Sequence, residues 1–301
     1  MRIGMMVGEG SGAAPDIAAL VERGKAAEAA GMHTAWIANI ELDAMTASTA
    51  LGAATTTIEI GTAVVPTYTR HPTAMARQAG STQQVCAGRF TLGIGLAHRF
   101  MVEKAWGLSY DRPARHMREY LEIIGPLLRG EPVEHRGDLY QVNLQAPPGD
   151  ATEILVAALG PVMLRLAGEL AGGTITWATG IRTLSEHIVP GLSEGAARGG
   201  RSAPRVVAGF PVVVTNQPEQ ARELAAKIFA GYAQIPSYRA MLDREGAQGL
   251  EDLAILGDEN LVRSELSRLE SAGVTDLCAF PFEAEPGDAA RTVEFLGSLA
   301  Q

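Results

Sequence analysis

The sequence predicts an α/β fold, a single (β/α)8 TIM barrel domain over residues 1–301 with insertions after the fourth and seventh strands. Eight apolar runs alternate with segments of helical character, and no linker-like tract separates them. The runs at 58–65 and 90–95 are apolar on both faces, which is typical of parallel strands covered on two sides. A doubly wound open sheet is the alternative fold.

The first half of the chain reads as four strand–helix units. Strands are predicted at 2–7, 34–39, 58–65 and 90–95, with a glycine-rich loop at 8–12. Pro15 and Asp16 are expected to open the first helix, which Gly31 is suited to end, and Asp43 is an N-cap candidate for the second. The third helix is expected to start near Pro72.

The second half repeats the pattern with longer connections. A loop of roughly 15 residues follows the fourth strand, and loops of this length often bind ligands. The fourth helix has the clearest apolar stripe, with a kink expected at Pro126; the stripe comprises Met117, Tyr120, Leu121, Ile124, Leu127 and Leu128. A hairpin is expected around residues 137–138 within the excursion 130–152.

The last four strands are predicted at 154–159, 174–178, 206–214 and 276–282. Helices are expected from Gly160-Pro161 onward, at 184–198, at 218–231, at 258–271 and at 288–299, with a further helical segment at 238–256.

Charge and composition exclude several classes of partner. The net charge is −9 and no run of Lys or Arg occurs, which argues against a nucleic acid or an anionic membrane as partner. No apolar run reaches the ~18 residues of a membrane helix, and the N-terminus does not resemble a signal peptide. Cys86 and Cys278 form no motif, so we expect reduced cysteines in a cytoplasmic protein. The six histidines show no metal-ligand spacing, and we expect no metal.

The glycine pair Gly93 and Gly95 does not indicate a dinucleotide site. That fingerprint requires a third glycine at the start of a helix, but the third position here is His98, followed by a long loop. Polar side chains instead gather where strands end, including Thr67 and Arg70 after the third strand. In parallel α/β barrels the chemistry lies at these carboxyl ends, so we expect the active site there.

Several motifs in order resemble the luciferase-like monooxygenase family over nearly the whole chain. They resemble most closely its branch dependent on coenzyme F420, an 8-hydroxy-5-deazaflavin. The matching runs are Gly61-Thr-Ala-Val-Val-Pro, Arg70-His-Pro, Gly88-Arg-Phe-Thr-Leu-Gly-Ile-Gly, Ala157-Ala-Leu-Gly-Pro and Ala272-Gly-Val-Thr-Asp.

The resemblance implies a cofactor site at two places. In many relatives a bulge with a non-prolyl cis peptide supports the ring system, and the matching bond is Ala63–Val64, next to Val65. The turn at Gly160, Pro161 and Val162 is expected to hold a phosphate through free backbone N–H groups. A plain strand end and a tight turn without ligand are the structural alternatives.

Further residues are weaker candidates for the cofactor site. Thr179 and Gly180, after the sixth strand, form a possible second cofactor contact, with Arg182 as a nearby charge. Asn39 and Ile40 stand where many deazaflavin-dependent relatives carry Asp and His, and Asn39 is expected to hydrogen-bond the pyrimidine edge of the cofactor. This departure removes a titratable pair that the resemblance would otherwise imply.

His98 is the expected catalytic residue, because related deazaflavin enzymes carry a Glu proposed as acid at the matching place. An imidazole has a reference pKa of ~6.5, near working pH, and is therefore suited to proton transfer. The structural alternative is a histidine that fixes the loop 99–106 by hydrogen bonds.

These features together predict an F420-dependent oxidoreductase that transfers a hydride between the deazaflavin and a small organic substrate. One alternative is an FMN-dependent monooxygenase of the same fold, supplied by a separate flavin reductase. A second is a flavin-binding protein without catalytic activity. A homodimer is expected, because relatives are often dimers.

Overall fold

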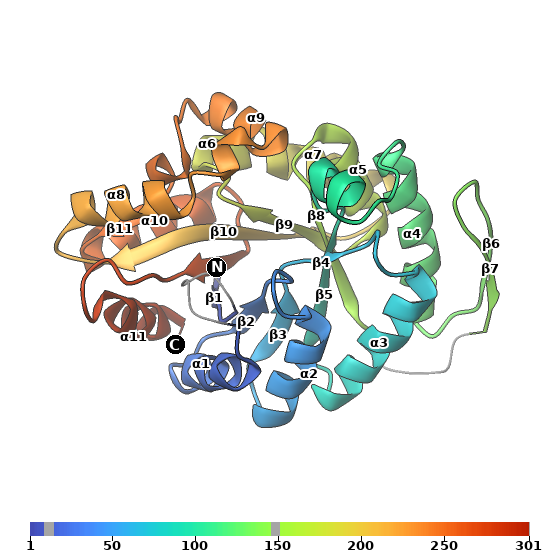
Figure 1. The fold of residues 1–301 in the computed structure, drawn as a ribbon, viewed down its shortest axis with the longest axis horizontal. Coiled ribbons are helices and arrows are strands. Elements are labelled where there is room, and N and C mark those ends of the chain that lie inside the picture. Colours follow the sequence, from blue (N-terminus) through green and yellow to red (C-terminus); the bar gives the residue numbers. More distant parts are fainter. Residues whose placement is uncertain (9–14, 146–150, 301) are drawn as a thin grey trace.

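The structure, a computed structural model that describes residues 1–8, 15–145 and 151–300, is a closed barrel of parallel strands surrounded by helices (Figure 1). The predicted TIM barrel is therefore confirmed. Strands pair in the order β1, β2, β3, β5, β8, β9, β10 and β12, and β12 pairs with β1. Their bounds are β1 Arg2–Met6, β2 Thr34–Ile37, β3 Glu59–Thr62, β5 Phe90–Gly95, β8 Glu153–Ala157, β9 Gly173–Trp177, β10 Arg205–Val214 and β12 Asp276–Phe280.

Helices follow the strands as predicted. Asp43 is confirmed as an N-cap, and Asp16 caps the first helix in the same way: their carboxylates accept the backbone N–H groups of Thr46 and Ala18 at 2.8 Å. The helix bounds are α1 Ile17–Ala29, α2 Ala44–Ala54, α3 Pro72–Val85, α4 Pro113–Leu128, α5 Pro161–Leu170, α6 Ile181–Thr183, α7 Val189–Arg198, α8 Pro218–Ile228, α10 Glu259–Ser271 and α11 Asp288–Ala300. The π-helical turn η2 Leu184–Ile188 joins α6 to α7. Apart from Gly8, the loop predicted at 8–12 lies outside the described residues.

The α4 stripe is buried as predicted, and the helix runs through Pro126 to Leu128. The predicted hairpin is also present, formed by β6 (Val133–Arg136) and β7 (Gln141–Leu144), and it projects beyond α4 at the right of Figure 1. The carboxylate of Glu119, on α4, accepts the three backbone N–H groups of residues 138–140 at 2.9–3.1 Å. The hairpin is therefore fastened to the helix that precedes it.

The two insertions contain elements that the sequence did not predict. The loop after β5 includes the π-helical turn η1 (Met101–Ala105). The segment predicted to be helical at 238–256 contains α9 (Pro236–Glu245) and then the strand β11 (Ile255–Gly257). Because β12 pairs with β10 only as far as Pro211, the end of β10 has a free edge, which β11 occupies. A three-residue strand is too short to give a period in the sequence.

Side-chain alternation divides the barrel interior into levels. At the amino ends of the strands the inward positions are charged or polar, with Arg205 at the centre of ion pairs. In the middle lies a buried apolar cluster of Trp36, Leu155, Ile175, Val207 and Cys278. Near the carboxyl ends the inward residues are small or aromatic, such as Ala63, Ala157 and Trp177.

Candidate active site

The predicted strand 58–65 is interrupted at the place where the resemblance expects the bulge. It divides into β3 and the short β4 (Val65–Pro66), which pairs with β5, and the peptide bond Ala63–Val64 is cis. Ala63 and Val64 are partly exposed and pack on the apolar cluster inside the barrel together with Met6 and Ala157. We call these four residues the floor. Val65, by contrast, is fully buried in the main core, so its side chain does not face the floor.

The glycines Gly93 and Gly95 make room for this bulge. A Cβ atom at Gly93 would lie 1.9 Å from the carbonyl oxygen of Thr62, and one at Gly95 would lie 2.7 Å from Cγ2 of Val64. Real Cβ atoms do not approach other atoms so closely, so both positions require glycine. The motif therefore has a packing function and is not a phosphate-binding loop, as the sequence indicated.

The amino end of α5 is exposed and open to an anion. Gly160 is the N-cap and offers no side-chain hydrogen bond, and Pro161 and Val162 are exposed, Val162 by 48%. The first N–H groups of a helix have no partner within the helix, and they attract negative charge. Leu159, at the end of the preceding strand, is held by the ring of His187, whose Nε2 lies 2.8 Å from its carbonyl oxygen. This turn has the chemistry of a phosphate site.

Close to the second predicted contact, at Thr179 and Gly180, several donors already have partners. The Glu245 carboxylate accepts the N–H groups of Arg182 and Thr183 at 3.1 and 2.8 Å and the hydroxyl of Thr183 at 2.7 Å. The guanidinium of Arg182 donates to the carbonyl of Arg244. An internal carboxylate therefore occupies donors beside this predicted contact, and the role of Thr179 and Gly180 stays a prediction.

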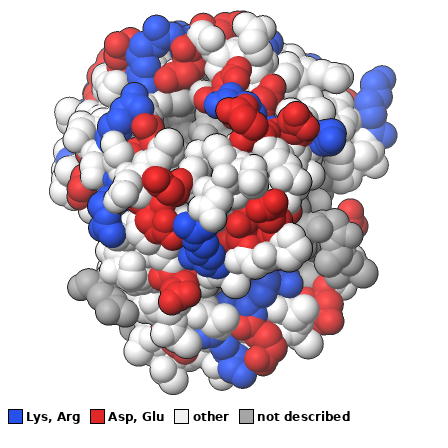
Figure 2. All heavy atoms as spheres, turned by 90° about the vertical axis from the view of Figure 1, so that its left-hand side faces the viewer, with Lys and Arg blue, Asp and Glu red and all other residues white. Residues whose placement is uncertain are grey.

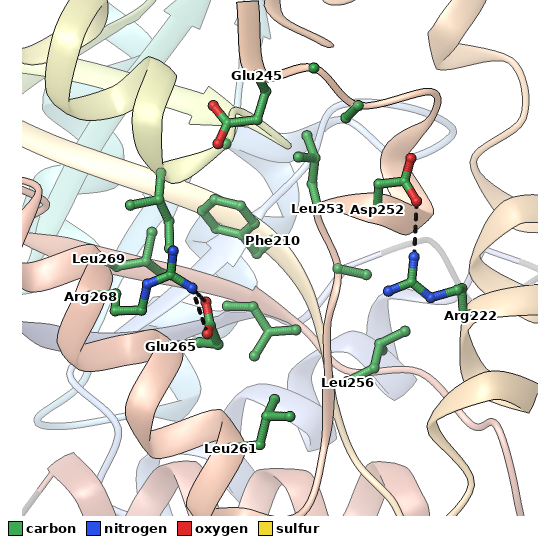
Figure 3. A pocket seen from close by; sticks show the side chains of 16 residues that line it. Phe210, Arg222, Glu245, Asp252, Leu253, Leu256, Leu261, Glu265, Arg268 and Leu269 are labelled. Carbon is green, nitrogen blue, oxygen red and sulfur yellow. Dashed lines mark hydrogen bonds and ion pairs between the residues drawn. The ribbon is translucent and has the colours of Figure 1, made fainter.

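A cavity of about 460 Å³ lies beside the barrel wall rather than over its mouth (Figure 3). Phe210 of β10 lines it, and the ion pairs Arg222–Asp252 (2.9 Å) and Arg268–Glu265 (2.7 Å) lie among its lining residues. Of the predicted cofactor residues only Gly180 lines this cavity. Its charged side chains are already paired, so the cavity does not mark the predicted site.

Asn39 is partly committed to the fold. Its side-chain oxygen accepts the backbone N–H of Ala44 at 3.1 Å and so holds the start of α2. The neighbouring Ile40 is 63% exposed.

His98 lies just beyond β5, and its side chain is uncommitted. Its backbone carbonyl accepts the N–H groups of Met101 and Val102 at 2.9 and 3.1 Å, so the backbone and not the ring fixes the following loop. Within the described chain the half-buried imidazole makes no side-chain hydrogen bond. Burial lowers the pKa of His98 below 6.5, which leaves the ring neutral at pH 7.

An arc of rings crosses the site from β9 to the loop after β5. Neighbouring ring centroids are 5.0–6.3 Å apart, within the range of favourable aromatic pairs. The members of this aromatic arc, in order of contact, are Trp177, Tyr232, Tyr238, His98 and Phe100. Tyr232 and Tyr238 were not predicted from the sequence, because they lie in the insertion after β10, where no period marks a buried face.

A cluster of polar side chains lies next to the end of β4. The buried His116 ring is stacked on Tyr68 at 4.0 Å, and its Nε2 is 2.9 Å from the hydroxyl of Thr67. Its Nδ1 is 3.4 Å from the hydroxyl of Tyr140, on the hairpin. Burial lowers the pKa of His116 to about 4, although Glu119 acts in the opposite direction. The cluster thus joins the hairpin to the end of β4 without a charge.

One face of the surface carries charges of both signs. On the face shown in Figure 2, acidic and basic side chains are interspersed. Throughout the described ranges, no helix is both long and apolar enough to cross a membrane. The same ranges contain no group of three His, Cys, Asp or Glu side chains that is able to hold a metal ion.

Comparisons with known proteins agree on one family. Residues 1–276 match the family model described as luciferase-like monooxygenase. The chain is 28% identical over 301 residues to 5,10-methylenetetrahydromethanopterin reductase of Methanopyrus kandleri, covering 84% of this chain and 86% of that protein.

Two solved structures with 18% identity share the fold and differ in cofactor. An F420-dependent secondary alcohol dehydrogenase in complex with an F420–acetone adduct has a TM-score of 0.81, with 99% of this chain and 97% of that chain covered. The oxygenating constituent of 3,6-diketocamphane monooxygenase from Pseudomonas putida, in complex with FMN, has a TM-score of 0.76, with coverage of 99% and 97%.

Proposed function

We propose a cofactor and a reaction for this chain from one premise: it belongs to the luciferase-like monooxygenase family. The chain is an oxidoreductase. The proposed cofactor is coenzyme F420, and the proposed reaction is hydride transfer between this deazaflavin and a small organic substrate. A cytoplasmic homodimer is part of the proposal, and the two free, buried cysteines are compatible with a reducing compartment.

One arrangement carries the proposal: a floor in which three of the four side chains are small, together with an uncapped helix start. Ala63, Val64 and Ala157 leave the carboxyl end of the barrel without bulky groups on this side, which fits a flat ring system. The exposed start of α5 at Gly160 fits the phosphate of the cofactor. Both features follow strands of the same barrel, so a single extended ligand is able to contact both.

When bound, the deazaflavin accepts or donates a hydride at its carbon 5. The protein then has to hold the substrate at the ring and balance the charge that develops on the substrate oxygen. His98 is suited to this because its ring is neutral, half-buried and free of hydrogen bonds within the described residues. It is the proposed catalytic residue.

The relatives support F420 more than FMN, and the fold alone does not select between them. The reductase of Methanopyrus kandleri aligns with 84% of this chain. Its solved structure is described as that of a coenzyme F420-dependent enzyme. The FMN complex of the same fold supports an FMN-dependent monooxygenase as the second candidate. A flavin-binding protein without turnover is the third.

Titration of the purified protein with each cofactor tests the first choice. We expect F420 to bind at least tenfold more tightly than FMN, a difference of about 1.4 kcal/mol, as measured by cofactor fluorescence. Tighter binding of FMN by the same factor would overturn the choice of F420. Turnover with a bound cofactor separates the enzyme from a silent binding protein.

Gly160→Glu tests the phosphate site in the same titration. A carboxylate at the start of α5 repels the phosphate, so we expect cofactor affinity to fall by at least about 100-fold while the fold survives. Gly160→Ala is the matched control, because a Cβ atom there meets no atom within 4 Å. Unchanged affinity of the Glu variant would remove α5 from the site.

A further inference from the structure

The aromatic arc has an apolar body that continues into the core. Trp177 packs edge-to-face against Phe229 and Phe280 at 5.7 and 5.9 Å. Met6 packs on the buried apolar cluster that contains Phe229 and Phe280. It also packs on the cluster beneath the floor, so it joins the two clusters. A substrate that contacts both the floor and the arc therefore meets mainly carbon.

Four polar groups of the arc have no hydrogen-bond partner among the described residues: the His98 ring, the hydroxyls of Tyr232 and Tyr238, and the indole N–H of Trp177. Within the described chain neither the Tyr238 hydroxyl nor the His98 ring has a hydrogen-bond partner, and their rings meet edge-to-face at 5.9 Å. Burial raises the pKa of Tyr238 and lowers that of His98, so both groups are uncharged at neutral pH. They provide neutral hydrogen bonds to one polar group of a ligand.

The arginines next to these two residues are already engaged. Arg99 pairs with Glu103 at 2.7 Å and lies over the ring of Tyr110. Arg239 pairs with Asp243 at 2.8 Å and donates to two backbone carbonyls, at residues 247 and 248. A phosphorylated substrate would need an uncommitted cation or a cluster of free N–H groups, and the arc supplies neither.

We propose that Tyr238 determines specificity and that the aromatic arc selects a small, uncharged carbonyl or alcohol compound with an apolar body. This inference rests on the proposed oxidoreductase function and deepens it by naming the substrate class. Tyr238 contributes the ring against which the apolar body packs, 5.9 Å from the ring of His98, and its hydroxyl binds the substrate oxygen. Anionic sugar phosphates are excluded.

Ligand-observed NMR titrations with two probes test the selectivity, both in the apoprotein and with F420 added. We expect acetophenone, an uncharged aromatic ketone, to bind at least about tenfold more tightly than glucose 6-phosphate. Tyr238→Ala should weaken acetophenone binding about five- to tenfold, whereas Tyr238→Phe should weaken it only about twofold. Ile228→Ala, an exposed position on α8 outside the arc, should change nothing.

Tighter binding of glucose 6-phosphate, no binding of acetophenone, or an unchanged acetophenone affinity in Tyr238→Ala would overturn the inference. The outcome is separate from that of the proposed function. Failure of F420 to bind, with acetophenone selectivity intact in the apoprotein, would overturn the cofactor assignment and leave the arc as the binding surface.

Discussion

At the amino ends of the barrel strands the inward side chains are charged and paired, whereas at the carboxyl ends they are small or aromatic and leave polar groups free. The guanidinium of Arg205 meets Glu59, Glu153 and Asp276 at 2.5–3.0 Å. Although burial acts against the charge, these carboxylates raise the pKa of Arg205 above its usual range. At the opposite end the His98 ring has no hydrogen-bond partner among the described residues.

The difference shows how one alternating pattern serves two tasks. Inside a closed barrel, a buried charge is tolerable only with partners, so the paired end holds strands together that are distant in sequence. A free polar group at the other end is costly for stability, and it persists where a ligand supplies the missing partner. Stability and binding are thus separated along the barrel axis.

Arg205→Met should produce the largest effect by breaking the paired end. Glu59 and Asp276 would remain buried together with only Arg2 nearby, so we expect a loss of about 3–5 kcal/mol in the free energy of unfolding. Urea denaturation at pH 7 measures it. Arg222→Met, which removes an exposed ion pair, is the control and should cost less than about 1 kcal/mol. If Arg205→Met also lost less than about 1 kcal/mol, the paired end would not contribute more to stability than an exposed ion pair does.

His98→Ala tests the free end, where function rather than stability should change. If the ring transfers a proton, turnover should fall about 10²-fold with cofactor affinity nearly intact. Since burial lowers the pKa of His98, the acid limb of the wild-type pH–rate profile should lie below pH 6.5. His71→Ala, at the exposed N-cap of α3, is the control. Turnover within a few-fold of wild type across pH 5–9 would contradict the catalytic role.

His116→Gln tests how the stability of the region around β4 depends on pH, in comparison with the paired end of the barrel. His116 has a folded pKa of about 4 and an unfolded pKa near 6.5, so its stabilising effect is complete above pH 6.5 and is lost as the pH falls toward 4. Between pH 7 and pH 5 the wild type should lose roughly 2 kcal/mol of stability at most through this residue. The pKa of Glu59 at the paired end is lowered, so its contribution is lost only at a more acidic pH, below about 4.5.

Denaturation curves at several pH values provide the measurement. The His116→Gln variant should show a flatter dependence on pH than the wild type between pH 7 and pH 5. His71→Gln, a histidine that is exposed, should keep the wild-type slope. Identical slopes for all three proteins would refute a neutral, buried His116.

The sequence was sufficient for the features that depend on near neighbours. The eight strands could be predicted because parallel strands are apolar on both faces, and α4 because its buried residues repeat with the helical period. The caps Asp16 and Asp43 act within three residues, so their signals are also local. Resemblance added the bulge at Ala63–Val64, which no local pattern indicates.

Only the tertiary structure decided which groups near the predicted site are free. Glu245 occupies the N–H group of Thr183 from 62 residues away, and Tyr238 meets His98 across the insertion after β10. Hydrophobic periodicity reports which face of one element is buried, but it holds no information about which distant side chain covers that face. The order of strands and helices could therefore be predicted from the sequence. The pairing of donors, acceptors and rings at the barrel mouth could not, because it depends on how the closed barrel brings its loops together.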